Sequence, residues 1–175
     1  PGENGNGPCS YYELSDETKA APISWSWDFD NDGTEDSTVQ NPSYTYNTPG
    51  IYTVSLIASG NGGSDTETKT DYITVYTPAA ADFSASATTG IGTLATTFTD
   101  ASTGDVDTWS WDFDNDGTED STLQNPSYTY NTPGTYAVAL TASGLGGSDT
   151  ETKTDHITVY IPAAADFTSD TTSGP

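Results

Sequence analysis

The sequence contains no arginine and only three lysines, against 26 acidic residues, so its formal net charge at pH 7 is -23. Proteins bind nucleic acid through lysine and arginine contacts to phosphates, and this composition therefore excludes a nucleic-acid partner. The same deficit argues against binding to anionic membrane surfaces. A surface this acidic favours a soluble, self-repelling protein that binds cations or works in salty water.

Methionine is absent, and Cys9 is the single cysteine among the 175 residues. The missing methionine predicts a mature or trimmed segment, whose signal peptide was removed or never included. Cys9 has no intramolecular partner, so it is either a free thiol or half of an intermolecular disulfide. No apolar run approaches the length that spans a membrane, so no membrane insertion is expected.

The chain contains an internal repeat, in which residues 25–83 align without gaps with residues 109–167. Between residues 51 and 58, every second residue is identical in the two copies and every residue between them differs. This alternation predicts a strand whose unchanged face lies in the core and whose changed face is exposed. The unchanged residues of the first copy are Tyr52, Val54, Leu56 and Ala58.

The stretch Trp25-Ser26-Trp27-Asp28-Phe29 alternates large aromatic and polar residues, and it returns from Trp109 to Phe113. That period predicts a strand with Trp27 and Trp111 in the core; the alternative is an exposed aromatic surface that stacks on carbohydrate. Short strands punctuated by glycine and proline, without a helical period, predict an all-β fold of two tandem β-sandwiches.

The predicted organisation has five segments. They are a flexible arm over residues 1–9, a first sandwich over 10–77, a linker over 78–81, a second sandwich over 82–161, and a linker with the start of another strand over 162–175.

We expect the first sandwich to lack its first strand. The positions that align with the second copy's strand over 81–87 fall at or before the start of the chain. Residues 165–171 repeat the start of that strand, with no sandwich after it. This spare strand either begins the next domain of a longer array or completes the first sandwich of another molecule by strand addition. The second reading predicts a head-to-tail filament. Its expected contact residues are Ala165, Asp166, Phe167, Thr168, Ser169 and Asp170.

A carboxylate-rich loop follows each aromatic strand. Asp28, Asp30 and Asp32 occupy positions one, three and five of a D-x-D-x-D-G pattern, a spacing that wraps hard oxygen ligands around one calcium ion. Position twelve, where the full calcium loop has a bidentate glutamate, is Val39, so a further ligand must come from elsewhere or from water. The predicted ligands are Asp28, Asp30, Asp32, Thr34 (through its carbonyl) and Asp36, and in the second copy Asp112, Asp114, Asp116, Thr118 and Asp120.

A simpler interpretation of the loop is an Asn-Asp-Gly turn in which Asp28 accepts hydrogen bonds from backbone amides. Magnesium fits less well, because it favours fewer carboxylates and more waters. Catalysis by the paired carboxylates has no support from any nucleophile or histidine partner, so we expect no enzyme. His156, the only histidine, is expected to be an exposed surface residue.

Three motifs together resemble the PKD domain family. They are Trp25-Ser26-Trp27-Asp28-Phe29, Asn41-Pro42-Ser43-Tyr44-Thr45-Tyr46 and Pro49-Gly50-Ile51-Tyr52-Thr53-Val54, and the second copy carries all three. The family pattern reads W-x-W-D-F-G-D-G, N-P-x-H-x-Y and P-G-x-Y-x-V. This sequence departs from it where Asp30-Asn31-Asp32-Gly33 gives a longer, more acidic loop.

The resemblance implies immunoglobulin-like sandwiches and an extracellular or cell-surface module that serves as a spacer or binding module. We therefore expect a structural module, either a calcium-stiffened repeat of a surface protein or a head-to-tail filament subunit. Its partners would be like subunits or neighbouring repeats. The alternative is an accessory module of a secreted hydrolase that binds polysaccharide or protein substrate.

Overall fold

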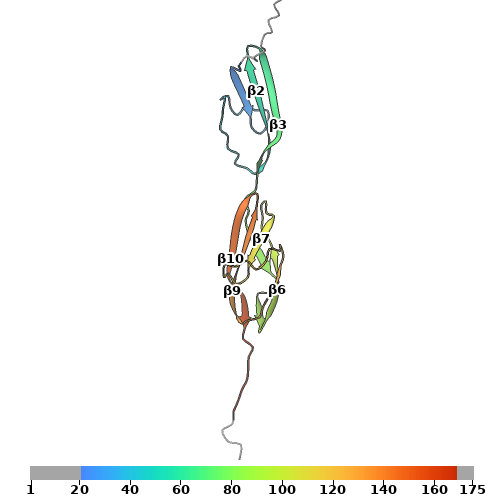
Figure 1. Cartoon of the computed structure of the whole chain (residues 1–175), viewed down its shortest axis with the longest axis vertical. Coiled ribbons are helices and arrows are strands. Elements are labelled where there is room, and N and C mark those ends of the chain that lie inside the picture. The colour runs from blue at the N-terminus through green and yellow to red at the C-terminus, as the bar shows by residue number, and fades with distance from the viewer. Residues whose placement is uncertain (1–20, 169–175) are drawn as a thin grey trace, which may run out of the picture. The chain divides into compact units, whose positions relative to one another are not determined.

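The computed structural model describes residues 21–168, which form ten β-strands and no helix (Figure 1). The predicted all-β class is therefore confirmed. The chain divides into two units between Thr74 and Val75. Within the described range, nothing helical is long and apolar enough to cross a membrane. The predicted arm over 1–9, with Cys9, lies outside the described residues, as do Ser169 and Asp170 of the predicted subunit contact.

In the described part of the first unit, the strands form one three-stranded sheet in the order β1-β2-β3. Its strands are β1 (Ser24–Asp28), β2 (Gly50–Gly60) and β3 (Gly63–Val75). Strand β1, which carries the aromatic alternation, pairs antiparallel with β2 from Ser24 opposite Ser59 to Asp28 opposite Ser55. The first sheet therefore fixes one end of the acidic loop, because that loop begins where β1 ends.

The second unit is a sandwich of two sheets, in the orders β5-β10-β9-β7 and β4-β6-β8. Its strands are β4 (Phe83–Ala85), β5 (Thr89–Ile91), β6 (Leu94–Asp100), β7 (Thr108–Asp112), β8 (Ser127–Tyr130), β9 (Gly134–Gly144) and β10 (Gly147–Tyr160). Strands β7, β9 and β10 stand at the aligned positions of β1, β2 and β3.

The chain crosses from one sheet to the other between β4 and β5. Strand β4 pairs antiparallel with β6, whereas β5 pairs parallel with β10. The side chain of Thr96 holds the crossing, because its Oγ1 donates to the Ala87 carbonyl (2.8 Å) and accepts from the Ala87 amide (3.2 Å). The strand expected over residues 81–87 is therefore too long: the observed strand ends at Ala85, where the chain leaves the sheet formed by β4, β6 and β8.

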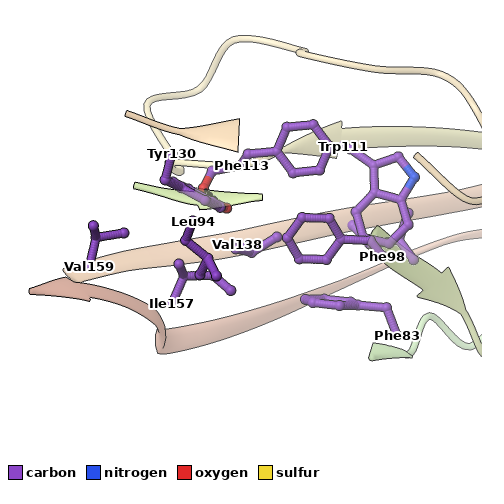
Figure 2. Packing of buried hydrophobic residues seen from close by; sticks show 10 residues of the cluster. Phe83, Leu94, Phe98, Trp111, Phe113, Tyr130, Val138, Ile157 and Val159 are labelled. Atoms are coloured by element: carbon purple, nitrogen blue, oxygen red, sulfur yellow. Dashed lines mark hydrogen bonds between the residues drawn. The ribbon is translucent and has the colours of Figure 1, made fainter. Parts of the chain in front are cut away.

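Aromatic rings fill the space between the two sheets of the second unit, as Figure 2 shows. Trp111 has no exposed surface, and its ring lies 5.2 Å from that of Phe83 and 5.4 Å from that of Phe98. The prediction that Trp111 is a core residue is confirmed. The unchanged face of the repeated strand is also buried, since Val138 and Leu140 are fully inaccessible.

The residues before β4 are held against the second unit. The amide of Thr77 donates to Asp105 Oδ2 (2.6 Å), and the amide of Asp105 donates to the Thr77 carbonyl (3.1 Å). Ala80 and Thr103 exchange two backbone hydrogen bonds, of 3.0 and 2.9 Å. Residues 78–81, expected to form a linker, are thus tied to the unit that follows them.

Candidate metal centre

Each unit carries one acidic loop, over residues 28–36 in the first unit and 112–120 in the second. Two residues of each loop have positive φ, namely Asn31 (58°) and Gly33 (87°) in the first and Asn115 (56°) and Gly117 (90°) in the second. Asparagine and glycine are the residues that adopt this conformation most readily, so the Asn-Asp-Gly sequence itself produces the tight turn.

The ends of each loop are anchored to the strand before it. In the second unit the Asp120 amide donates to the Trp111 carbonyl (2.7 Å), and the Phe113 amide donates to Asp120 Oδ2 (2.7 Å). The hydroxyl of Tyr130 donates to the Phe113 carbonyl (2.9 Å), and Trp111 Nε1 donates to the Leu123 carbonyl (2.8 Å). Buried aromatic residues therefore fix where the loop begins and ends.

Inside the loop, backbone amides turn toward the carboxylates. Asp28 Oδ1 accepts from the Asp32 amide (3.2 Å), and Asp28 Oδ2 accepts from the Gly33 amide (2.9 Å). Asp32 Oδ1 accepts from the Thr34 amide (2.7 Å). The second loop repeats these contacts at 3.2, 2.8 and 2.8 Å. Asp28 thus caps the turn as the simpler interpretation requires, and each carboxylate oxygen keeps a second lone pair for another partner.

The structure brings three carboxylates together in each loop. One oxygen from each of Asp28, Asp30 and Asp36 lies within 4.8 Å of the others, and the same holds for Asp112, Asp114 and Asp116 in the second unit. Calcium binds oxygen at 2.3–2.6 Å, so ligands on opposite sides of one ion lie about 5 Å apart. In each loop, the three oxygens are therefore close enough to bind one calcium ion together.

The two groups differ in one member. Asp36 belongs to the first group and Asp116 to the second. The backbone-amide contacts do not explain the difference, because Asp36 and Asp120 accept from equivalent amides, as do Asp32 and Asp116. Thr34 and Thr118, predicted as carbonyl ligands, are fixed through their amides, and their carbonyl role stays a prediction.

The pKa of Asp114, at the centre of the second loop, is raised in the folded protein. Burial raises the pKa of Asp114 first, and the negative charges of Asp116, Asp120 and Asp112 raise it further, against a lowering by the Asp116 amide. The ionised form of this carboxyl is thus disfavoured in the folded loop. A bound cation would reverse this effect, because an opposite charge favours the ionised form.

The sequence analysis did not predict a lysine contact with Asp82 and Phe83 in the second unit. Lys153 Nζ forms an ion pair with Asp82 Oδ1 (2.7 Å), donates to the Phe83 carbonyl, and lies 4.6 Å from the centre of the Phe83 ring. The ion pair lowers the pKa of Asp82. Asp82 and Phe83 lie 71 and 70 positions before Lys153, so no local pattern in the sequence predicts this contact.

The expectation that His156 is exposed is wrong. Its ring is half-buried against Phe83, with the ring centres 5.5 Å apart, and its buried Nε2 has no hydrogen-bond partner. Asp155 just before it has a φ of 53°, and the pairing of β10 with β9 shifts register between Lys153 and Ile157. This β-bulge turns His156 toward the core, which regular alternation does not predict.

The predicted subunit-contact residues from Ala165 to Thr168 follow β10 without secondary structure, and all four are exposed. Phe167 stands out, because 91% of its surface is accessible to solvent. Burial of a large aromatic side chain releases water from much apolar surface, so this exposure leaves a strong driving force for contact unused.

Both units thus present the same immunoglobulin-like arrangement of aromatic strand, turn and tyrosine, and the second shows the complete sandwich. The sequence matches the PKD domain family over residues 11–75 and again over 77–159. The chain belongs to the PKD domain family. Domains of this family are modules of extracellular proteins and are typically non-catalytic.

Solved structures of similar folds include the PKD1 domain of Vibrio anguillarum Epp, at 26% identity and a TM-score of 0.40, with 50% of this chain and 99% of that chain covered. Another is the N-terminal four Ig domains of Dscam1 isoform 6.9, at 14% identity and a TM-score of 0.40, with 79% of this chain and 37% of that chain covered. Extracellular domains 3–5 of Drosophila OTK match at 15% identity and a TM-score of 0.40, with 65% and 40% covered.

Proposed function

We propose that the chain is a non-catalytic structural module of an extracellular or cell-surface assembly, and that its two acidic loops bind calcium, which stiffens each unit. As a repeat or filament subunit it would act with like subunits or neighbouring repeats. The observation that carries the calcium proposal is the convergence of three carboxylates within 4.8 Å in each loop.

Charge balance supports a cation at these loops. The loop over residues 28–36 contains five carboxylates and no lysine. Repulsion among them opposes the compact turn; in the matching loop, burial first and then the neighbouring negative charges raise the pKa of Asp114. A hard divalent cation such as calcium relieves this repulsion, because it binds oxygen ligands, carboxylates among them.

Stiffening follows from how the loops are anchored. Residues Asp36 and Asp120 each close a loop on the aromatic strand, through the amides of Phe29 and Phe113. An ion that joins the start of the loop to its middle or end would therefore couple the turn to the core. Because such an ion binds the folded loop and not the unfolded chain, it adds stability.

Calorimetric titration of the full chain with calcium tests this proposal. We expect measurable heat and a higher melting temperature, with added stability of about 2.7 kcal/mol when calcium is at a hundred times its dissociation constant. Asp30→Asn combined with Asp114→Asn should abolish both effects. The matched control is Glu35→Gln combined with Glu119→Gln, which removes the same charge from each loop outside the three-carboxylate groups and should keep both effects.

A wild-type chain that shows neither heat nor a shift in melting temperature with calcium would contradict the metal assignment. Loss of binding in the control pair, to the same extent as in the aspartate pair, would show that only net charge matters. Magnesium in place of calcium provides the selectivity measurement, and we expect it to bind more weakly.

The competing role, an accessory substrate-binding module, needs an exposed aromatic surface. Trp111 has none, and the indole Nε1 of Trp109 donates to Asp100 Oδ2 (2.8 Å). The tryptophans of the second unit are therefore committed to the sandwich, which favours the structural role.

A further inference from the structure

An open groove of about 390 Å³ lies beside the hairpin between β2 and β3 of the first unit. Its lining includes Pro22, Ala58, Gly62 and Asp65. Gly62 faces open space, because a Cβ built on it has no heavy atom within 4 Å. We refer to this feature as the hairpin groove.

In the second unit, residues 77–84 fill the place that corresponds to the hairpin groove. Gly146 stands where Gly62 stands in the first unit, and a Cβ on Gly146 would lie 2.0 Å from the Thr77 carbonyl oxygen. The amide of Ala81 donates to Asp149 Oδ2 (2.9 Å), and Asp149 aligns with Asp65. Residues 77–84, which we call the entry segment, therefore occupy the second unit's counterpart of the hairpin groove.

The end of the entry segment also completes the second core. Phe83 is 2% exposed and packs on Trp111 and His156, while Lys153 holds both Asp82 and the Phe83 carbonyl. The first unit has the matching groups, but residues 21–74, the described part of this unit, do not cover them in the same way. Trp27 is half-buried, Lys69 and Tyr72 are exposed, and Lys69 Nζ lies over the Tyr72 ring at 4.7 Å.

The chain contains one other copy of the entry segment, at residues 161–168. From Pro162 to Phe167 its sequence is identical to residues 78–83, and every residue from 161 to 168 is exposed. Ile161 and Phe167 expose 80% and 91% of their surface. The chain thus carries a second copy of the segment that fills this place in the second unit, and no residue of this second copy is buried.

We propose that residues 161–168 of one molecule dock in the hairpin groove of a second copy of this chain. Phe167 packs on Trp27, Asp166 pairs with Lys69, and the Ile161 carbonyl passes over Gly62, as Phe83, Asp82 and the Thr77 carbonyl do at the matching places of the second unit. The contact joins different surfaces of the two molecules, so it repeats without closing and builds a linear polymer.

The second unit's own place for this segment is already filled by residues 77–84, so the hairpin groove is its free counterpart. Within one molecule every residue from 161 to 168 is exposed, which favours a second copy of the chain as the partner. Docking between molecules makes association depend on protein concentration, whereas docking within one molecule would leave the chain monomeric at every concentration.

The decisive variant is Gly62→Ala in the full chain. Because Gly62 has free space and no positive φ, the added methyl leaves the isolated molecule unchanged, yet it collides with the incoming carbonyl. Sedimentation over a concentration series should show polymers for the wild-type chain and association weakened by about tenfold or more for Gly62→Ala. Asn61→Ala, on the same hairpin, is the matched control and should polymerise as the wild type does.

A second pair of variants tests the docking segment. Phe167→Ala removes the aromatic anchor and should weaken association, whereas Thr168→Ala, aligned with the exposed Ser84, should not. Gly62→Ala keeps its docking segment and Phe167→Ala keeps its groove. At a concentration where each variant alone stays monomeric, equal amounts of the two should therefore form dimers and no longer species.

Polymers formed equally well by the wild type, Gly62→Ala and Phe167→Ala would overturn the proposal. So would a wild-type chain that stays monomeric at high concentration, as expected if residues 161–168 only begin a following domain. This contact rests on the proposed structural role but not on calcium. Each experiment is run with calcium and with a chelator, so a failed metal site and a failed docking contact give different results.

Discussion

Trp27 and Trp111 stand at the same position of two nearly identical sequences, yet Trp27 is half-buried and Trp111 has no exposed surface. The strands that carry them pair in the same register with β2 and β9. What differs is the second sheet, because β4, β6 and β8 cover Trp111 and the described part of the first unit contains no counterpart to them. A strand's own sequence therefore sets which face is apolar, while the opposite sheet sets how far that face is buried.

The tyrosine segment makes the same point about the backbone. Ser127–Tyr130 forms β8 because it pairs with β6, from Thr97 opposite Ser127 to Leu94 opposite Tyr130. The identical residues 43–46 form no strand. Both tyrosines still donate to equivalent carbonyls, Tyr46 to that of Phe29 (3.0 Å) and Tyr130 to that of Phe113 (2.9 Å). The tyrosine hydrogen bond therefore forms in both units, although only Ser127–Tyr130 has the backbone pairing that makes it a strand.

The largest expected difference between the units comes from truncating the tryptophan. Trp111→Ala removes a fully buried ring and should lower the free energy of unfolding of the second unit by about 3–5 kcal/mol. Trp27→Ala should cost clearly less under conditions where the chain is monomeric, because its ring is already partly in water. Calorimetric unfolding of both variants measures the two costs. Equal costs would mean that the first core is as closed as the second.

A smaller difference is expected at the hairpin glycines. Gly146→Ala forces a methyl group against the Thr77 carbonyl and should destabilise the second unit by about 1–3 kcal/mol. Gly62→Ala should be nearly neutral in the monomer. Chemical denaturation of the two single variants checks this contrast, and a neutral Gly146→Ala would show that residues 77–81 do not pack there.

The costs in stability of replacing Lys153 and Lys69 should differ by less than the costs of the two glycine substitutions. Lys153→Ala breaks the ion pair with Asp82 and the contact with the Phe83 ring, and should cost about 1 kcal/mol, since the pair is partly exposed. Lys69→Ala should change monomer stability little, because Lys69 only lies over the exposed Tyr72 ring. Thermal melts at low and high salt separate the ionic part of the Lys153 effect.

The smallest expected effect depends on pH and on the single histidine. Burial, and after it the Lys153 charge, lower the pKa of His156, so the folded unit binds this proton less readily than the unfolded chain does. Its contribution to stability is full above the ordinary histidine pKa of about 6.5 and declines as the pH falls below it. His156→Tyr, which installs the residue of the first unit, should remove this part of the decline.

Melting temperatures of the wild type and of His156→Tyr at pH 7.5 and pH 5 test this. Identical losses in the two proteins would show that His156 does not cause the decline. Asp100 does not contribute to the decline over this range of pH: burial would raise its pKa, but hydrogen bonds from Ser102, Gln124 and Trp109 outweigh burial and lower the pKa. Its contribution to stability is lost only when the pH falls below about 4.

The core face of the strands and the turns of the acidic loops could be predicted from the sequence, because they depend on local patterns of residues. The alternation around Trp111 and the unchanged face of β9 predicted the core, and Asn-Asp-Gly predicted the turn of each acidic loop. The sheet crossing after Ala85, the bulge at Asp155 and the lysine contact with Phe83 were not predictable in this way. Each of these depends on segments far apart in the chain, whose pairing no local pattern contains.

The entry segment has a consequence for how such a chain changes in length. By sequence, residues 77–83 end the first copy of the repeat, but in the structure they pack against the unit that follows. An 84-residue period cut at residue 77 therefore contains a whole sandwich together with its own entry segment, from Thr77 to Tyr160. Recombination between copies can add or remove such a block and leave every internal contact intact, so selection can vary the number of units without redesigning any of them.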